Sequence, residues 1–299
     1  MTVGVTRSTY GEIEEKMDEA VERGRGLKLH DGCKVVIKIN LCDFRMPESG
    51  AVTHPIFLRA VLKYLRSHFT ELEICVVESD ATVARPDRLV TWLGLEPILQ
   101  EYQARWLNLS KDKTVKKMID GYFFREMEVP KVIEDSDCLI TMPKMKTSLL
   151  TKITCSLKNQ YGCIPYPRKI RFHHVLDDAI ADACLAMKPD FCIVDGILGM
   201  GGVKGPDLGV PIQSNVVVTG SDAVAVDSVC AEIMNFQPNL IGHIRKAQAA
   251  GVGRISREIV GEKVSAVRKD FEYNLLYASA LRLAMRLKLS HDRRSGSGC

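Results

Sequence analysis

The segment from residue 138 to residue 176 carries an unusual set of charged side chains. It contains no aspartate or glutamate, although the overall frequency of these residues predicts about five over this length. Positive charge without internal counter-charge favours an anionic ligand, and a solvated basic surface is the alternative interpretation. The basic side chains of the segment are Lys144, Lys146, Lys152, Lys158, Arg168, Lys169, Arg171, His173 and His174.

The start of this segment is expected to lie at the edge of a sheet. The strand-like run DCLITM leads directly into PKMKTS, and Pro143 ends the strand. In open α/β sheets, ligands bind beyond the carboxyl ends of the strands. We therefore expect Lys144, Lys146, Thr147 and Ser148 to bind substrate at that edge.

Further along the segment, lysine and histidine side chains could carry the chemistry. Lys158 in TCSLKNQYG could act as a base, a nucleophile or a clamp for carboxylate or phosphate, with Asn159 beside it binding substrate. His173 and His174 precede a helix in KIRFHHVLDD. Adjacent histidines cannot present both rings to one metal ion in helix geometry, so no metal ligands are predicted. Either could act as an acid or base, and helix capping or a surface role is the alternative.

Two other strand ends supply polar side chains. Lys38 and Asn40 close the strand-like run VVIKINLC, where the flanking residues are apolar, and both are expected to bind substrate. Glu78 and Asp80 follow a second strand in VVESDATV. A carboxylate at a strand end can bind a substrate hydroxyl or serve as a base, and we assign Glu78 to binding and Asp80 to catalysis.

A glycine-rich stretch, CIVDGILGMGGVKGPDLG, follows another strand. Asp195, Gly201 and Gly202 are predicted to contact substrate there, because glycine permits close approach of the backbone to a ligand. A structural turn is the alternative. The stretch matches neither GxxxxGK[ST] nor GxGxxG before a helix, so no nucleotide-binding signature is present.

Short apolar runs alternate with stretches of helical periodicity. This pattern predicts an α/β fold with mostly parallel sheets covered by helices, forming two lobes with a cleft between them. Thr53 and Asp222 are expected N-caps. The expected strands are Lys34–Asn40, Glu73–Glu78, Asp137–Met142, Phe191–Gly196 and Asn215–Gly220, and the expected helices are Pro55–Phe69, Arg85–Tyr102, Val175–Met187 and Ala223–Met234.

Three ranges are expected along the chain: an N-terminal α/β lobe at 1–188, a smaller α/β lobe at 189–270, and a basic helix with a flexible tail at 271–299. The helix is predicted over Tyr273–Leu289, with Leu276 and Leu283 on the face that docks on the body. A helix that binds a partner or a membrane surface is the alternative. The final RRSGSGC is predicted to be a flexible tail.

The overall composition is that of an ordinary globular protein. The chain has 41 Lys and Arg against 37 Asp and Glu, a net charge of +4 that is too small to argue for nucleic acid as a partner. The sparse aromatic residues do not interleave with the basic segment as a stacking surface for bases would, so no nucleic acid is expected. The sequence predicts no membrane span and no signal peptide, so the cytoplasm is the expected location. The ten cysteines show no CxxC and no ferredoxin spacing, and most are expected to be buried. A homodimer is compatible with the sequence.

Several of these motifs together resemble a known family. IKIN, VVESDAT, DCLITMPKMKTSLLTKITCSLKNQYGCIP, KPDFCIVDGILGMGG and TGSDAVAVDSVCAEIM are similar to the uncharacterised family called domain of unknown function 362, over about Lys34 to Gly253. Some members carry a segment with two four-iron clusters, which is not present in this sequence. Members usually have histidine after PKxKT, where this chain has Ser148.

A more distant resemblance is to the nickel-pincer lactate racemases. The spacing of their histidine, lysine and second histidine falls here on Ser148, Lys158 and His174. In those enzymes the lysine holds the cofactor covalently and the histidines flank nickel. Because serine replaces one histidine, a nickel-pincer site is not expected here, and the resemblance implies two α/β lobes with Lys158 and His174 facing a cleft.

The main hypothesis is a cytoplasmic enzyme that acts on a small carboxylate or phosphate metabolite, by isomerisation, lyase chemistry or group transfer. Lysines would hold the anion, and a histidine with a carboxylate would move protons. No cofactor is identified. The alternative is a non-catalytic protein that binds or delivers an iron–sulfur cluster or metallocofactor through Cys155, Cys163 and neighbouring histidines.

Overall fold

One large sheet forms the centre of the molecule. The computed structural model of the chain describes residues 1–82, 84–166, 168–202, 209–280 and 283–284. Within them, a ten-stranded sheet has the order β12-β1-β11-β10-β7-β2-β3-β4, with β8 on β10 and β9 on β8, and β5 and β6 form a separate pair. The strands are β1 (Thr2–Arg7), β2 (Lys34–Lys38), β3 (Glu73–Glu78), β4 (Arg105–Asn108), β5 (Thr114–Met118), β6 (Glu126–Pro130), β7 (Cys138–Thr141), β8 (Lys144–Ser148), β9 (Lys152–Thr154), β10 (Phe191–Gly201), β11 (Val210–Gly220) and β12 (Glu258–Gly261).

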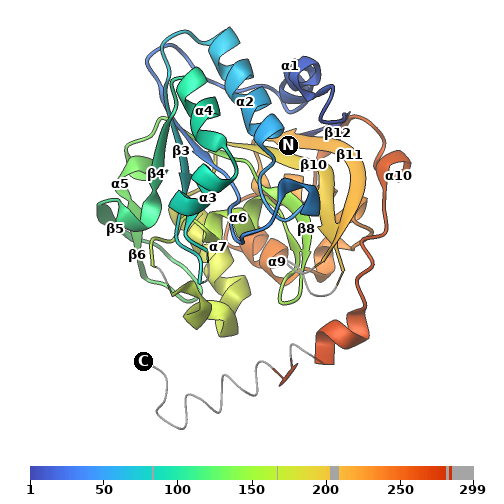
Figure 1. Cartoon of the computed structure of the whole chain (residues 1–299). Coiled ribbons are helices and arrows are strands. Elements are labelled where there is room, and N and C mark those ends of the chain that lie inside the picture. Colours follow the sequence, from blue (N-terminus) through green and yellow to red (C-terminus); the bar gives the residue numbers. More distant parts are fainter. Residues whose placement is uncertain (83, 167, 203–208, 281–282, 285–299) are drawn as a thin grey trace.

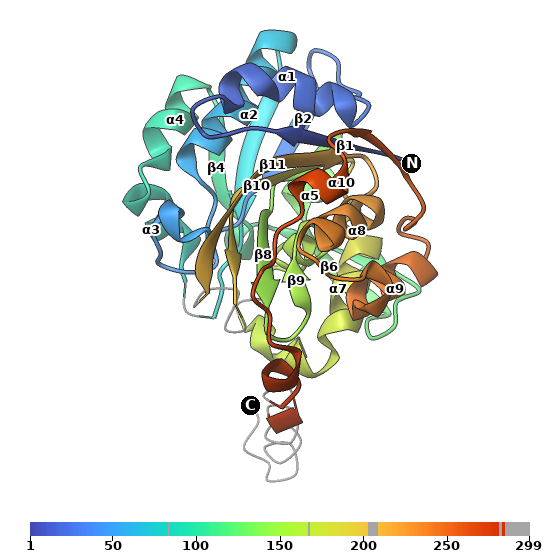
Figure 2. The ribbon, with the colours of Figure 1, turned by 90° about the vertical axis from the view of Figure 1, so that its right-hand side faces the viewer.

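Helices cover both faces of this sheet, as Figures 1 and 2 show. Helices α1 to α4 pack on one face and α6 to α9 on the other, and each layer has its own apolar core. The helices are α1 (Ile13–Arg23), α2 (Pro55–His68), α3 (Pro86–Trp92), α4 (Leu95–Glu101), α5 (Lys131–Glu134), α6 (Ser156–Tyr161), α7 (Leu176–Ala186), α8 (Ala223–Ile233), α9 (Gly242–Ala249) and α10 (Val264–Val267).

The central strands are apolar on both faces because both faces are covered. In β2, Val36 belongs to one core, whereas Val35 and Ile37 belong to the other. Strand β2 pairs in parallel with β3 and β7, and β7 pairs in parallel with β10. The expected α/β fold with a mostly parallel sheet is therefore confirmed, and the carboxyl ends of β2, β3 and β7 meet at one edge.

Two local predictions are wrong. The expected helix Arg85–Tyr102 is interrupted at Gly94, which has φ +64 and separates α3 from α4. Glycine adopts this left-handed conformation without steric cost, which ends one helix and starts the next. The N-cap of α2 is His54, whose side chain accepts from the backbone of Ile56, while Thr53 Oγ1 accepts from the backbone of Asn40 instead. The predicted cap at Asp222 is confirmed.

The glycine-rich stretch is largely strand rather than loop. β10 continues to Gly201 and pairs antiparallel with β11. A Cβ on Gly201 would lie 2.7 Å from the carbonyl oxygen of Phe271, and the backbone N–H of Gly202 donates to that oxygen at 2.8 Å. Because these glycines have no side chain, the later segment around Phe271 can pack directly against their backbone. Residues 203–208 of the predicted loop lie outside the described residues.

Strands from both sides of the predicted boundary at 188–189 belong to the same sheet, since β10 joins β7. The division into ranges 1–188, 189–270 and 271–299 stays a prediction. Of the C-terminal helix, residues 275–280 and 283–284 are helical. Leu276 and Leu283, which were expected on a docked face, are 86% and 60% exposed. Leu287 and the RRSGSGC tail lie outside the described residues.

Candidate functional site

A cavity of about 400 Å³ opens beyond the carboxyl ends of β2 and β3. Strands β8 and β9, helix α6 and the 3₁₀ segment Lys169–Val175 complete its wall. Among the described residues, it is lined by Lys38, Asn40, Leu41, Cys42, Glu78, Ser79, Ala81, Thr82, Lys146, Ser148, Leu149, Leu150, Thr154, Lys158, Asn159, Tyr161, Gly162, Lys169, Ile170, His173 and Leu176.

Lys38 and Glu78 form a buried ion pair at the base of the cavity. Lys38 is 1% exposed, and its Nζ lies 2.7 Å from Glu78 Oε1. The same ammonium donates to Ile39 O at 2.7 Å and to Asn159 Oδ1 at 3.3 Å. The carboxylate of Glu78 also accepts from the backbone of Leu41 at 2.9 Å. The charge of Lys38 is thus compensated inside the protein.

Lys146 is also buried, but its hydrogen-bond partners among the described residues are uncharged. Its Nζ donates to Asn40 Oδ1 at 2.9 Å, to Ala51 O at 2.6 Å and to Cys42 Sγ at 3.0 Å. These acceptors satisfy the three donors of an ammonium group without cancelling its charge. Asn40 and Asn159 hydrogen bond to each other at 3.1 Å, which joins the surroundings of Lys146 to those of Lys38.

Lys169 lies at the opposite wall and is a site residue that sequence reasoning did not single out. Its Nζ donates to Ser79 Oγ at 2.7 Å, to Asp80 O at 2.8 Å and to Ile164 O at 3.1 Å. Burial lowers the pKa of Lys169 to about 8. The only sequence signal was its membership of the basic segment; nothing distinguished it from the exposed Arg168.

Lys158, Ser148 and His173 form a polar group on the wall of the cavity. Lys158 Nζ lies 2.6 Å from Ser148 Oγ, and Ser148 is 1% exposed. Burial, with a smaller effect from the nearby Lys158, lowers the pKa of His173 to about 4, so its ring is neutral near neutral pH. Its Nδ1 and the hydroxyl of Thr154 are buried without a hydrogen-bond partner in the described part of the chain.

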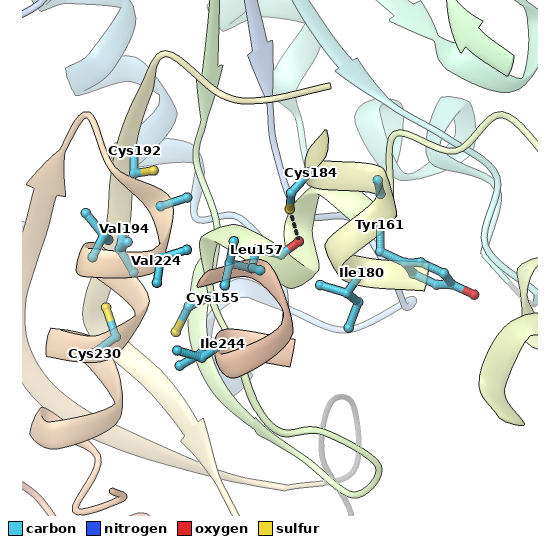
Figure 3. Close-up of a cluster of buried hydrophobic side chains, with 14 of the residues drawn as sticks. Cys155, Leu157, Tyr161, Ile180, Cys184, Cys192, Val194, Val224, Cys230 and Ile244 are labelled. Carbon is cyan, nitrogen blue, oxygen red and sulfur yellow. Dashed lines mark hydrogen bonds between the residues drawn. The ribbon is translucent and has the colours of Figure 1, made fainter. Parts of the chain in front are cut away.

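Helix α6 carries Lys158 and Asn159, and hydrogen bonds and apolar contacts with the core fix its position. The buried carboxylate of Asp227 accepts from the backbone N–H groups of Ser156 at 2.7 Å and Leu157 at 3.0 Å. Burial raises the pKa of Asp227 to about 6. Figure 3 shows Leu157 and Cys155 among apolar side chains of α7, α8 and α9, with Cys184 Sγ donating to Leu157 O at 3.5 Å. The short helix is thereby packed against the core.

The structure brings eight of the expected site residues to the cavity and leaves seven outside its lining. Lys144 and Asp195 form a separate buried ion pair at 2.8 Å, joined by Tyr10. Thr147 also lies outside the lining, and its Oγ1 donates to Gly202 O. Asp80 Oδ1 accepts from Asn108, and His174 Nδ1 lies against Arg171 O. The two remaining residues outside the lining are Gly201 and Gly202. Those gathered at the cavity are Lys38, Asn40, Glu78, Lys146, Ser148, Lys158, Asn159 and His173.

All of the described lining residues fall between positions 38 and 176. The described part of the cavity wall therefore lies within the predicted N-terminal range, where β8, β9 and α6 fold back over the ends of β2 and β3. The expected position of the site between two lobes stays a prediction.

The described residues contain neither a cluster of possible metal ligands nor a helix suited to span a membrane. No group of three or more His, Cys, Asp or Glu side chains is placed to hold one metal ion there. Of the nine cysteines described, Cys42 is partly exposed and the other eight are buried. None of the helices in these parts of the chain is long and apolar enough to cross a membrane.

The fold and the cavity define an α/β protein with four lysines and one carboxylate among the described residues around a cavity at the edge of its sheet. Residues 35–232 match the model of the family described as "Domain of unknown function (DUF362)". The chain belongs to this family, as the sequence motifs predicted.

Two comparisons with individual proteins add to this. The chain is 24% identical over 244 residues to a protein of Synechocystis sp. named "thylakoid-associated protein sll1697", a match that covers 79% of this chain and 74% of the relative. It is also similar to the lactate racemase apoprotein from Thermoanaerobacterium thermosaccharolyticum, with 14% identity and a TM-score of 0.49 over 79% of this chain. The chain spans 57% of the length of that racemase.

Proposed function

We propose that this protein is an enzyme that acts on a small carboxylate or phosphate metabolite bound in the cavity, with Lys158 and His173 moving protons. The observation that carries this proposal is the imbalance of charge in the lining. The described lining residues include four lysines and a single carboxylate, Glu78. With His173 neutral, basic side chains therefore outnumber acidic ones four to one among the described lining residues.

Uncompensated charge in a cavity costs free energy that an anion recovers when it binds. Lys146 and Lys169 are almost fully buried, and their hydrogen-bond partners among the described residues are carbonyl, amide, hydroxyl or thiol groups. Charges act more strongly on one another in such surroundings than in water. An anionic ligand is therefore the complement that this set of side chains favours.

Three of the lining lysines are held by acceptors of the protein itself. Lys38, Lys146 and Lys169 each have at least three acceptors from the protein, which matches the donor capacity of an ammonium group. We assign them to the electrostatic field of the cavity. Direct contact with the ligand is assigned to Lys158 and His173, because a neutral imidazole with a buried, unpartnered Nδ1 can accept or donate a proton.

The apolar part of the lining limits the ligand further. Leu41, Leu149, Leu150, Ile170 and Leu176 contribute hydrophobic surface to the same lining. A ligand with a charged head and a short apolar portion would use both parts of the cavity. We retain the cytoplasm as the expected location and leave the oligomeric state as a prediction.

Native mass spectrometry and elemental analysis of anaerobically purified protein, followed by calorimetric titration with phosphate, succinate and hexanoate, test this proposal. We expect a co-purifying or titrated anion whose affinity depends on Lys158, with no metal at stoichiometric level. Stoichiometric iron or nickel would support the alternative, a protein that binds or delivers a metallocofactor. Absence of binding by all three anions and of any bound metabolite would contradict the proposal.

A further inference from the structure

Ser148 and Lys158 form a pair of a kind that can activate a hydroxyl group. Ser148 Oγ lies 2.6 Å from Lys158 Nζ, and both residues line the cavity. Ser148 ends β8, and Lys158 lies in the first turn of α6, ten residues later. Both elements are anchored, β8 by pairing with β10 and α6 by the carboxylate of Asp227. The contact therefore joins two fixed parts of the fold.

We propose that Ser148 is a nucleophile activated by Lys158 as its general base, for acyl transfer from an ester or thioester substrate. A serine hydroxyl is a weak nucleophile until an adjacent base accepts its proton, and serine–lysine pairs are one known solution. This inference rests on the proposed function only for the anionic group that the substrate carries. It adds the reaction class and the nucleophile.

A second proton acceptor lies near Lys158. His173 lines the same cavity, and it is close enough to Lys158 for the charge of the lysine to affect the titration of the imidazole. A proton that leaves Ser148 therefore has two basic side chains nearby, Lys158 and His173.

A second observation independently points to a ligand at this place. The hydroxyl of Thr154 is 3% exposed, lines the cavity and has no hydrogen-bond partner in the described part of the chain. Thr154 of β9 is paired with Lys146 of β8, and Ser148 lies two residues after Lys146 on the same strand. A buried, unpartnered donor beside a nucleophile is suited to stabilising the oxyanion that forms when the nucleophile attacks a carbonyl group.

The reaction balances with the substrate and water alone. Ser148 Oγ forms a bond to the acyl carbon, the bond from that carbon to the leaving oxygen or sulfur breaks, and the hydroxyl proton passes to neutral Lys158. Lys158 then gives the proton to the leaving group, which departs as an alcohol or thiol. Water attacks the acyl-serine, gives a proton to Lys158 and releases the carboxylic acid, and the serine recovers its proton.

The test uses small fluorophosphonates, which modify activated serines with loss of fluoride. Full-length protein is incubated with an ethyl and with an octyl fluorophosphonate at several values between about pH 6 and 10, and the adduct is measured by intact mass and located by peptide mapping. We expect one adduct, on Ser148. It should be absent in Ser148→Ala and form at least about tenfold more slowly in Lys158→Arg, which keeps the charge but cannot serve as a base.

Ser214→Ala is the matched control, because Ser214 is also buried with an unpartnered hydroxyl but does not line the cavity. This variant should be labelled at the rate of the original protein. No adduct on Ser148 with either reagent at any pH, or equal labelling of Lys158→Arg, would overturn the inference.

Phosphate titration of the same samples separates this inference from the proposed function. Phosphate binding without an adduct would overturn only the nucleophile. An adduct on Ser148 without binding of any of the test anions would support the nucleophile and contradict the proposed anionic ligand.

Discussion

Lys144 and Lys146 lie two residues apart in β8 and are both buried, yet their surroundings differ. Lys144 is 0% exposed and donates to Asp195 Oδ2 at 2.8 Å and to Tyr10 OH at 2.9 Å. Lys146 is 1% exposed, and within the described part of the chain its ammonium group hydrogen bonds only to neutral groups. The first lysine is paired away from the cavity, and the second lines it.

This difference separates a structural use of buried charge from a functional one. The Lys144 pair satisfies both charges inside the protein, and desolvation costs about as much as such a pair returns. A buried lysine without a carboxylate partner has no such internal compensation, so a ligand can supply the missing negative charge. We therefore assign binding to the cavity lined by Lys146 and Lys169, and a structural role to Lys144 and Asp195.

The largest expected effect comes from removing one member of the structural pair. Asp195→Asn leaves the ammonium of Lys144 buried without its counter-charge, and such changes cost about 3 to 5 kcal/mol. Urea unfolding near neutral pH should show this loss of free energy of unfolding. Phosphate affinity of the folded variant should stay within about twofold of the original. A loss of affinity with unchanged stability would reverse the assignment of the two regions.

Replacing the lysine that we assign to ligand contact should have the opposite profile. Lys158→Ala should weaken binding of the preferred anion at least about tenfold, equivalent to about 1.4 kcal/mol, because it removes a charge that contacts the ligand. Stability should change by about 1 kcal/mol or less, since Lys158 is only partly buried. Isothermal titration and urea unfolding measure the two quantities.

Lys152→Ala provides the matched control for that experiment. Lys152 belongs to the same basic segment but lies outside the cavity lining, and its Nζ donates to Leu240 O at 2.7 Å. Anion affinity should be nearly unchanged in this variant. Equal losses in Lys152→Ala and Lys158→Ala would indicate a diffuse surface effect rather than a defined site.

The pH dependence of binding should reveal Lys169. Its folded-state pKa is lowered from 10.5 to about 8, so its positive charge is lost as the pH rises through about 8. Anion affinity should fall severalfold over this range. The contribution to stability has the opposite sign: between about 8 and 10.5 the unfolded chain binds more protons, and folding becomes more favourable as the pH rises.

Lys169→Met tests whether that titration belongs to Lys169. Methionine keeps much of the volume but does not titrate, so affinity should be lower than in the original protein and should lose the step near pH 8. Calorimetric titrations at a series of pH values provide the comparison. A step near pH 8 that persists in Lys169→Met would assign the titration to another group.

The smallest effect is expected when both members of the structural pair are replaced. In Lys144→Met with Asp195→Leu, no charge is left buried alone, and replacement of buried ion pairs by apolar residues is often nearly neutral. The loss of partners for the Tyr10 hydroxyl should cost about 1 kcal/mol. Stability close to that of the single variant Asp195→Asn would instead show that the pair itself is required.

Much of the fold could be predicted from local patterns. The strand Glu73–Glu78 is confirmed with its bounds, and α2 and α8 begin at the expected residues. These elements have continuous apolar runs or helical periodicity, which depend on few distant contacts. The break at Gly94 could not be predicted from the helical periodicity. The strand through the glycine-rich stretch could not be predicted either, because it depends on contact with the distant segment at Phe271.

The candidate site could be predicted as a region but not residue by residue. The absence of acids from 138 to 176 indicated the basic wall, and polar strand ends indicated Lys38, Asn40 and Glu78. Nothing local distinguishes Lys144 from Lys146, because Asp195 reaches Lys144 only through the pairing of β8 with β10. Lys169 could not be distinguished for the same reason, because its partners Ser79 and Asp80 lie far away in the sequence.

Crystals soaked in bromide would show whether the cavity is an anion site, because anomalous scattering locates this anion without knowledge of the substrate. We expect bromide in the cavity, within contact distance of Lys158 and near His173, and none beside Lys144. Bromide beside Lys144 with an empty cavity, or an empty cavity at every concentration tested, would contradict the claim that uncompensated lysine charge makes this cavity an anion site.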